Sequence, residues 1–465
     1  MEIMKVPEDA ISNDDSIKSR RGISIITVCL FIVGEIAGTG ILAFPESFKG
    51  MGWFGTVVII LACLGGGYTG IALGNSWLIL EDRDECHKER TRDPYSVIGE
   101  VACGVAGRRW TSITLVIMLF GSSCIQELVF SETMSALIPD NGLPFCYWIV
   151  VIGIGLLPFT YLGSPVDFWP VAFFAMSSTT IACFLIVIAI LIQDDQFNVE
   201  TTETFLSDNT SVIIEQLSEN FGFDDVKPIF HITFKSIMLG ISTVVFGFGG
   251  AGVLPTIQND MRDKRQFNKA IVIAFALMLC LYLPVSSIGY WKFGTSVKSN
   301  IIRNLRPSPL VTAIQVLVLA HVFSAFLIQI NPVNLTLETA LGIEDSFNWK
   351  RCASRTFIVF LSVMTGLTVP KFGKLLNFLG AFSVSLQSFV LPALFYLKLR
   401  HPHKGSSSSW YSFLTPLSLG NFSLLLIAGF GIFIACFSTV YSLIDLIHPD
   451  SFAQPCFVNA CVKLD

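Results

Sequence analysis

The chain has 465 residues, of which 52% are hydrophobic and only 14% are charged, against about a quarter charged in soluble proteins. Its 36 glycines and 20 prolines fall mostly within apolar runs, which excludes a disordered, collagen-like or coiled-coil chain. The net charge of −5, without a basic stripe, argues against a nucleic-acid partner. Several runs are long enough to cross a bilayer, which takes about 20 residues. Composition therefore predicts an all-α, multi-pass protein in a lipid bilayer.

Eleven apolar segments are predicted to form membrane helices. In chain order they cover residues 23–45, 54–80, 111–137, 144–163, 168–192, 230–255, 270–291, 310–332, 356–370, 375–397 and 420–445. The ninth is the shortest, and its merger with the tenth would move the C-terminus to the other side of the membrane. We expect a cytoplasmic tail over 1–22, a transport domain over 23–448 and an outer or lumenal tail over 449–465.

The positive charges predict the orientation, because loops rich in Lys and Arg stay in the cytoplasm. With the N-terminus inside, the cytoplasmic segments hold 20 of the 30 Lys and Arg residues and the opposite segments hold 9. The sequence therefore favours a cytoplasmic N-terminus. The N-terminal tail carries no acidic dileucine signal, which favours the plasma membrane over an endomembrane such as a lysosome or vesicle without deciding between them.

The predicted outer or lumenal loop, residues 193–229, is acidic and carries the sequon Asn209-Thr210-Ser211. We expect Asn209 to be glycosylated, as a sequon on that side of the membrane can be. Cys146, Cys456 and Cys461 fall on the same, oxidising side, where a disulfide can persist. Sequence decides neither which of them pair nor whether they remain free thiols. The 12 cysteines show no metal-ligand spacing, so neither a metal nor another cofactor is predicted.

Glycine and proline interrupt the first and the sixth predicted helices. The first contains Gly34, Gly38 and Gly40 before Pro45, and the sixth contains a run from Gly247 to Gly252 before Pro255. Glycine in a helix interior costs about 1 kcal/mol relative to alanine, and unwound backbone is tolerated in a membrane only where protein or a cavity surrounds it. Broken helices at matching places in two halves indicate a 5+5 inverted-repeat transporter with one extra helix. Glycines that merely allow close helix packing are the alternative.

The chemistry of such breaks suits an amino acid. Half-helix N-termini offer unpaired N–H groups to a carboxylate, and freed carbonyl groups can accept from an ammonium. The predicted substrate-binding residues lie at the two breaks; they are Gly38, Thr39, Gly40, Phe248, Gly249, Gly250 and Gly252.

Both breaks resemble motifs of the amino acid/auxin permease family, whose members carry an amino acid transporter transmembrane domain. The similar stretches are Gly38-Thr39-Gly40-Ile41 through Pro45 and Phe248-Gly249-Gly250 through Leu254-Pro255. The resemblance extends over nearly all of 23–445 and is to the proton-coupled and vesicular branches. It implies a LeuT-like fold and secondary transport of amino acids, driven by protons or, in one branch, by sodium. Proton-coupled members carry a histidine where this chain has Phe31.

Ionisable side chains inside membrane helices are functional candidates because they are expensive to place there. Glu35 lies one turn before the first break, and we expect it to bind and release the coupling proton; a carboxylate that caps the broken backbone or forms a structural pair is the alternative. His321, in the eighth helix, is a second candidate, although a neutral histidine bonded to a carbonyl group is the plainer interpretation. Ser324 and Thr39 are candidates for a sodium site. Snorkelling or a Glu–Lys pair would account for Glu127 and Glu132 of the third helix and Lys235 of the sixth.

The sequence thus predicts a secondary amino acid transporter that works by alternating access, with H⁺ favoured over Na⁺ as the coupling ion. The alternatives are a sodium-coupled symporter and a transporter-like sensor that binds an amino acid and signals without flux. No nucleophile–base constellation is present, so an enzyme is not expected. The particular amino acid, the stoichiometry, the direction of transport and the oligomeric state are not encoded in any recognisable pattern.

Overall fold

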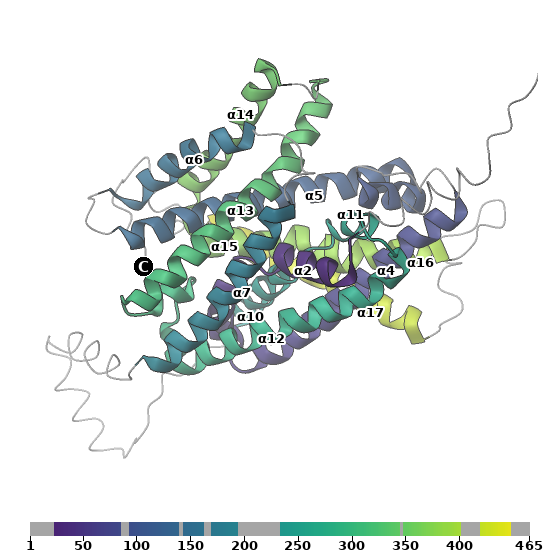
Figure 1. Ribbon diagram of the computed structural model, residues 1–465. Helices are drawn as coiled ribbons and strands as arrows, with labels where there is room; N and C mark the ends of the chain where they lie inside the picture. Colours follow the sequence, from purple (N-terminus) through teal and green to yellow (C-terminus); the bar gives the residue numbers. More distant parts are fainter. Residues whose placement is uncertain are drawn as a thin grey trace, which may run out of the picture.

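The computed structural model describes residues 23–84, 93–138, 143–161, 169–193, 233–344, 347–400 and 419–447. These residues form helices and no strand, with one isolated backbone bridge (Figure 1). The all-helical prediction is therefore confirmed. Asn209, Cys456, Cys461 and the two predicted tails lie outside the described residues, so their predicted roles stay predictions.

Helix occurs in each of the eleven predicted segments. The first half comprises α2 (Ile25–Ile36), α3 (Gly40–Met51), α4 (Phe54–Arg83), α5 (Pro94–Leu137), α6 (Phe145–Tyr161) and α7 (Trp169–Ile192). The second half comprises α10 (Phe234–Gly247), α11 (Leu254–Asn259), α12 (Phe267–Phe293), α13 (Pro309–Ala340), α14 (Trp349–Thr368), α15 (Phe372–Leu379), η7 (Gly380–Val390), α16 (Leu391–Arg400) and α17 (Leu419–Ile447). Short 3₁₀ turns occupy Lys264–Gln266, Gly294–Ser296 and Ile301–Asn304.

In the described part of the chain, seven helices are long and apolar enough to cross a membrane, or eight if α2 and α3 count as one span. α6 and α10 are shorter apolar helices, and α14 forms a separate 20-residue helix before α15. The multi-pass architecture is therefore confirmed, while the number of eleven spans stays a prediction. The tenth segment is continuous but changes winding, because η7 is π-helical between two α-helical parts.

The two predicted breaks are present. α2 and α3 meet at an angle of 57° across residues 37–39, and α10 is separated from α11 by residues 248–253. Glycine is needed where the breaks meet: a Cβ on Gly250 would lie 2.1 Å from Cγ1 of Ile36, and one on Gly247 would lie 2.2 Å from Cζ of Phe44. The two broken helices can approach this closely only because these positions carry no side chain.

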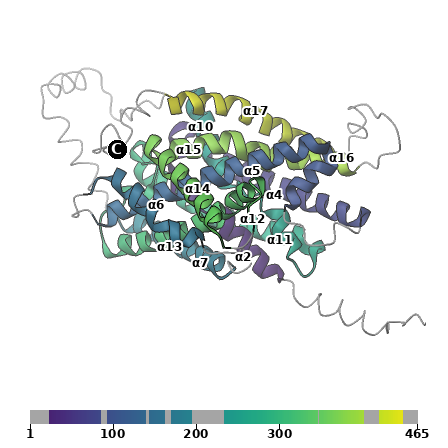
Figure 2. The ribbon, with the colours of Figure 1, turned by 90° about the horizontal axis from the view of Figure 1, so that it is seen from above.

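The breaks lie at the centre of the helix assembly. α12 packs against α2, α3 and α4, while α13 packs against α5 and α7. α17 lies at the periphery and packs on η7 and α10 (Figure 2). A backbone bridge ties the start of α2 to the chain after α11: Ile23 N–H donates to the Asp260 carbonyl oxygen, and Arg262 N–H donates to the Ile23 carbonyl oxygen, both at 3.1 Å.

The glutamates of the third predicted helix are buried, so the snorkelling interpretation is wrong for them. Glu127 is 1% exposed and accepts a hydrogen bond from the Ser362 hydroxyl of α14. Glu132 pairs with Arg303, at 3.4 Å between Nε and Oε1. Lys235 pairs instead with Asp445 of α17. Glu132 and Lys235 are thus paired through contacts between elements distant in sequence, whereas Glu127 is buried without a cation.

Candidate functional site

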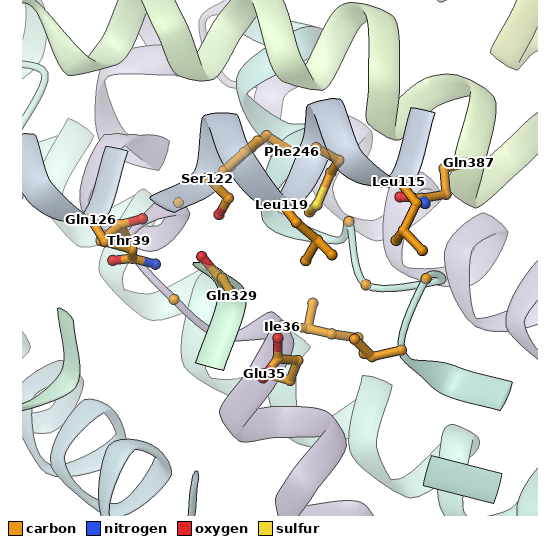
Figure 3. A pocket seen from close by; sticks show the side chains of 17 residues that line it. Glu35, Ile36, Thr39, Leu115, Leu119, Ser122, Gln126, Phe246, Gln329 and Gln387 are labelled. Atoms are coloured by element: carbon orange, nitrogen blue, oxygen red, sulfur yellow. The ribbon is translucent and has the colours of Figure 1, made fainter. Parts of the chain in front are cut away.

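A pocket opens where the two breaks face α5 (Figure 3). It comprises about 510 Å³ of space between atoms, part of it open to solvent. Its floor is the end of α2 with Glu35 and Ile36, and its opposite wall is α5 with Leu115, Leu119, Ser122 and Gln126. Phe246 of α10, Gln329 of α13 and Gln387 of η7 complete the side walls. Five elements distant in sequence thus converge on one cavity.

Backbone N–H groups at both breaks lack acceptors. The N–H groups of Gly38, Ile41 and Gly249 bond to nearby carbonyl groups. Those of Thr39 and Gly40 have no acceptor within the described residues, and neither do those of 250–252. Buried N–H groups are nearly always paired, and α3 also presents the positive end of its dipole here. This part of the pocket is therefore suited to an anionic group such as a carboxylate.

The carbonyl groups at the ends of α2 and α10 are held by a single side chain. Tyr282 of α12 is fully buried, and its hydroxyl oxygen lies 3.2 Å from the Ile36 carbonyl oxygen and 2.9 Å from that of Gly247. Because a hydroxyl group has one proton, the two carbonyl groups share it. Tyr282 thus links the two interrupted helices where each stops.

Glu35 is the one ionisable side chain among the described residues that line the pocket. It comes from the last turn of α2 and points toward Gln329 in Figure 3. No ion pair or hydrogen bond to its carboxyl group occurs within the described residues. A carboxyl group placed like this can change its protonation state without breaking an existing pair.

Three glutamines of the pocket were not singled out from the sequence. Gln126, Gln329 and Gln387 are only 2%, 7% and 2% exposed. Buried polar atoms are left unpaired on each: Oε1 of Gln126, Oε1 of Gln329 and Nε2 of Gln387. The sequence signal that could have identified them is an amide side chain inside an apolar helix. Burying an amide is unfavourable unless it forms a hydrogen bond. Sequence could not show that the three face one cavity.

A second, smaller cavity of about 290 Å³ lies on the other side of the first break. Gly38 and Thr39 line both cavities, and His321 of α13 lines the second. Nδ1 of His321 lies 2.6 Å from the Thr179 hydroxyl oxygen, while its Nε2 is buried without a partner. Glu35 and His321 therefore lie on opposite sides of the Gly38–Thr39 backbone and form no hydrogen bond with each other.

Most of the predicted site residues line the pocket, but Phe248 and Ser324 do not. Glu35 and six of the predicted binding residues line the pocket; those six are Gly38, Thr39, Gly40, Gly249, Gly250 and Gly252. Phe248 does not line it, because its ring is 1% exposed and packs against Tyr282 and Phe275, with centroids 5.2 and 6.3 Å away. Ser324 lines neither cavity; its hydroxyl donates to the Ala320 carbonyl oxygen of its own helix.

Solved structures similar to this one include MhsT in complex with L-phenylalanine, at 12% identity and a TM-score of 0.48, covering 89% of this chain and 99% of that one. Another is MHP1, a nucleobase-cation-symport-1 family transporter, at 13% identity and a TM-score of 0.49, covering 96% and 95%.

In sequence, the chain is similar to Amino acid transporter AVT1C of Arabidopsis thaliana, at 23% identity over 377 residues, which are 78% of this chain and 61% of that one. It is also similar to Lysine histidine transporter-like 6 of Arabidopsis thaliana, at 25% identity over 416 residues, 84% and 86% of the two chains. Residues 21–438 match the family described as Transmembrane amino acid transporter protein. The match confirms the resemblance drawn from the two glycine motifs, and the chain belongs to this family of transporters, which are not enzymes.

Proposed function

We propose that this protein is a secondary active transporter that carries amino acids across a membrane by alternating access, coupled to protons through Glu35. The observation that carries the proposal is the pocket at the two breaks, where unpaired N–H groups and one carboxyl group face a common space. Family membership supports amino acids as the substrate, since the relatives named above are called amino acid transporters or lysine histidine transporter-like.

The substrate's α-carboxylate would bind the unpaired N–H groups of the pocket residues Thr39, Gly40, Gly250 and Gly252. Its ammonium group would bind carbonyl oxygens freed at the breaks. A zwitterion bound in this way adds no net charge to the cavity. The charge balance of the occupied pocket then depends on Glu35 alone.

Coupling follows from the cost of enclosing an unpaired charge. With Glu35 ionised, closing the pocket would move a carboxylate out of water without a cation to pair it, which is strongly unfavourable. Protonation removes that penalty, so the closed and loaded state is favoured when a proton and a substrate are both bound. A proton that changes the relative free energy of two conformations in this way shifts their populations.

His321 is the second group we assign to coupling. Its unpaired Nε2 lies in the cavity on the far side of Gly38, 3.4 Å from the position that a Cβ on Gly38 would take. Transfer of a proton between Glu35 and His321 would need water or a movement of the 38–39 backbone. The hydroxyl groups of Thr39 and Thr179 line the same cavity, and they are where a sodium ion would bind if sodium were the coupling ion.

We also propose that the N-terminus is cytoplasmic. The Lys and Arg distribution supports this, and so does Cys146, which is disulfide-bonded to a partner outside the described residues. A disulfide at the start of α6 fits the outer or lumenal side. Glycosylation of Asn209 would place the 193–229 loop on that side too, and a mobility shift after enzymatic deglycosylation, absent in Asn209→Gln, would test it.

The function is tested by uptake of a labelled amino-acid mixture into proteoliposomes with imposed pH or sodium gradients, for wild type and Glu35→Gln. Accumulation that follows the pH gradient and is lost in the variant is the expected result. Accumulation that requires sodium and survives the substitution would remove Glu35 from coupling. Binding without flux under any gradient would replace the transporter with a sensor.

A further inference from the structure

If the pocket binds amino acids, as the proposed function states, its lining also bears on which amino acid side chain it accepts. The backbone N–H groups occupy the side formed by the two breaks. The amides of Gln126, Gln329 and Gln387 come from α5, α13 and η7, which are separate elements. The part of a substrate that meets these amides is therefore its side chain, once its carboxylate is bound at the breaks.

The amides lie close to the breaks. The position of a Cβ on Gly38 is 3.8 Å from Nε2 of Gln126, and that of a Cβ on Gly252 is 3.2 Å from Nε2 of Gln387. Gln329 faces the space above Glu35 (Figure 3). The Tyr95 hydroxyl donates to the backbone carbonyl oxygen of Gln387 at 2.5 Å and holds that residue's backbone in place. Two of the amides thus border the breaks, and all three line the cavity in which a substrate side chain would lie.

We propose that these three glutamines form a subsite for a neutral side chain that both donates and accepts hydrogen bonds, and that the substrates are amino acids with an amide side chain. A side-chain amide offers two N–H donors and one carbonyl acceptor. The unpaired atoms of the subsite are two acceptors, on Gln126 and Gln329, and one donor, on Gln387. Each glutamine amide can also turn about its terminal bond, so the subsite keeps both kinds of group in any orientation.

The same geometry disfavours other side chains. An aliphatic side chain would displace water from the three amides and leave them unpaired, which is unfavourable for buried groups. A carboxylate side chain would meet no basic group, because no Lys, Arg or His lines the pocket within the described residues. A cationic side chain would supply donors only, and it would lie unpaired beside a protonated Glu35. The amide side chain is the one that satisfies all three glutamines without adding charge.

The test uses the full-length protein in proteoliposomes under the gradient that drives its uptake. Labelled L-glutamine is competed with unlabelled L-glutamine, L-asparagine, L-methionine, L-glutamate and L-lysine. L-Methionine is close to L-glutamine in length without the amide, and L-glutamate replaces the amide with a charge. We expect half-inhibition by the two amide amino acids at concentrations about tenfold or more below those of the other three.

Two variants then locate the subsite. Gln329→Met keeps the length of the side chain and removes the amide, so we expect the preference for L-glutamine over L-methionine to fall about tenfold. Gln315→Leu is the matched control, because Gln315 is buried on the same helix and does not line the pocket; its preference should equal that of wild type. If Gln329→Met fails to fold, the wild-type competition series decides alone.

The outcomes separate the subsite from the transport function. Uptake of amino acids with L-methionine, L-glutamate or L-lysine as the preferred competitor overturns the subsite and leaves transport standing. An unchanged preference in Gln329→Met, with the protein folded, likewise overturns it. Failure of the wild type to bind or move any amino acid overturns both.

Discussion

The hydroxyl group of Tyr282 donates to the carbonyl oxygen of Gly247 at 2.9 Å, and so joins α12 to the last residue of α10. The same hydroxyl group reaches the Ile36 carbonyl oxygen at the end of α2. Both carbonyl groups belong to the last residue of a helix, where the regular i+4 donor is missing; that of Ile36 also accepts from the Gly38 N–H at 2.8 Å. The single hydroxyl group of Tyr282 thus supplies a hydrogen-bond donor at both helix breaks.

Tyr282→Phe removes this link without changing the packing of the ring. We expect a loss of about 1–3 kcal/mol of stability, since the buried Gly247 carbonyl group loses its donor and that of Ile36 keeps only the Gly38 N–H, together with slower transport. Thermal unfolding in detergent and initial uptake rates measure the two effects. Tyr290→Phe, on the same helix, is the control, because Tyr290 is only half-buried and packs through its ring against Phe48 and Trp53. Equal effects of the two substitutions would contradict the proposed link.

Gly250→Ala tests the close approach of the breaks. The added methyl group would lie 2.1 Å from Cγ1 of Ile36, so one of the two segments must move and we expect loss of substrate binding. Gly155→Ala on α6 is matched, because among the described residues no atom beyond its chain neighbours and its own helix backbone lies within 4 Å of the position of its Cβ. It should leave binding unchanged and stabilise the helix by up to about 1 kcal/mol. Ligand-dependent thermal shifts compare the two proteins.

Glu127 is a buried carboxyl group with no cation beside it, and substituting it tests whether the folded protein requires its negative charge. Its Oε1 has no partner, and its other oxygen accepts from Ser362. An ionised group in that position would cost several kcal/mol, so Glu127→Gln, which is neutral and of similar shape, should fold as stably as wild type. Glu127→Ala should be destabilised by about 2–5 kcal/mol through the cavity it leaves and the unpaired Ser362. Fluorescence size-exclusion profiles after graded heating separate the two results; a destabilised Glu127→Gln would show that the charge is required.

Arg355 is 1% exposed and contacts Glu338 of α13, at 2.6 Å between Nε and Oε1, as well as the Thr160 carbonyl oxygen of α6. Arg355→Met leaves a buried carboxylate with weaker pairing, and we expect a loss of about 3–5 kcal/mol. Arg108→Met breaks an exposed pair with Glu100 and should cost at most about 1 kcal/mol. Comparable losses in the two variants would mean that the Arg355 pair adds nothing beyond a surface contact.

The positions of the breaks could be predicted because glycine clusters are local signals that oppose a continuous helix. Glu35 could be predicted for the same kind of reason, since a lone carboxyl group in an apolar run stands out. The three glutamines could not be assigned to the pocket, because they are more than fifty residues apart in the sequence and only packing brings them together. For Phe248, the sequence motif located the residue at the second break but could not show where its ring points. The ring packs against Tyr282 and Phe275, and these contacts form only in the folded structure.

The bridge between Ile23 and the 260–262 segment bears on the order of events in a transport cycle. The start of α2 and the chain after α11 meet at this place, and the bonds that join them are between backbone atoms, so only a proline at position 23 or 262 would remove a donor. Under the proposed alternating access, a movement that parts the start of α2 from the chain after α11 would have to break these two backbone hydrogen bonds.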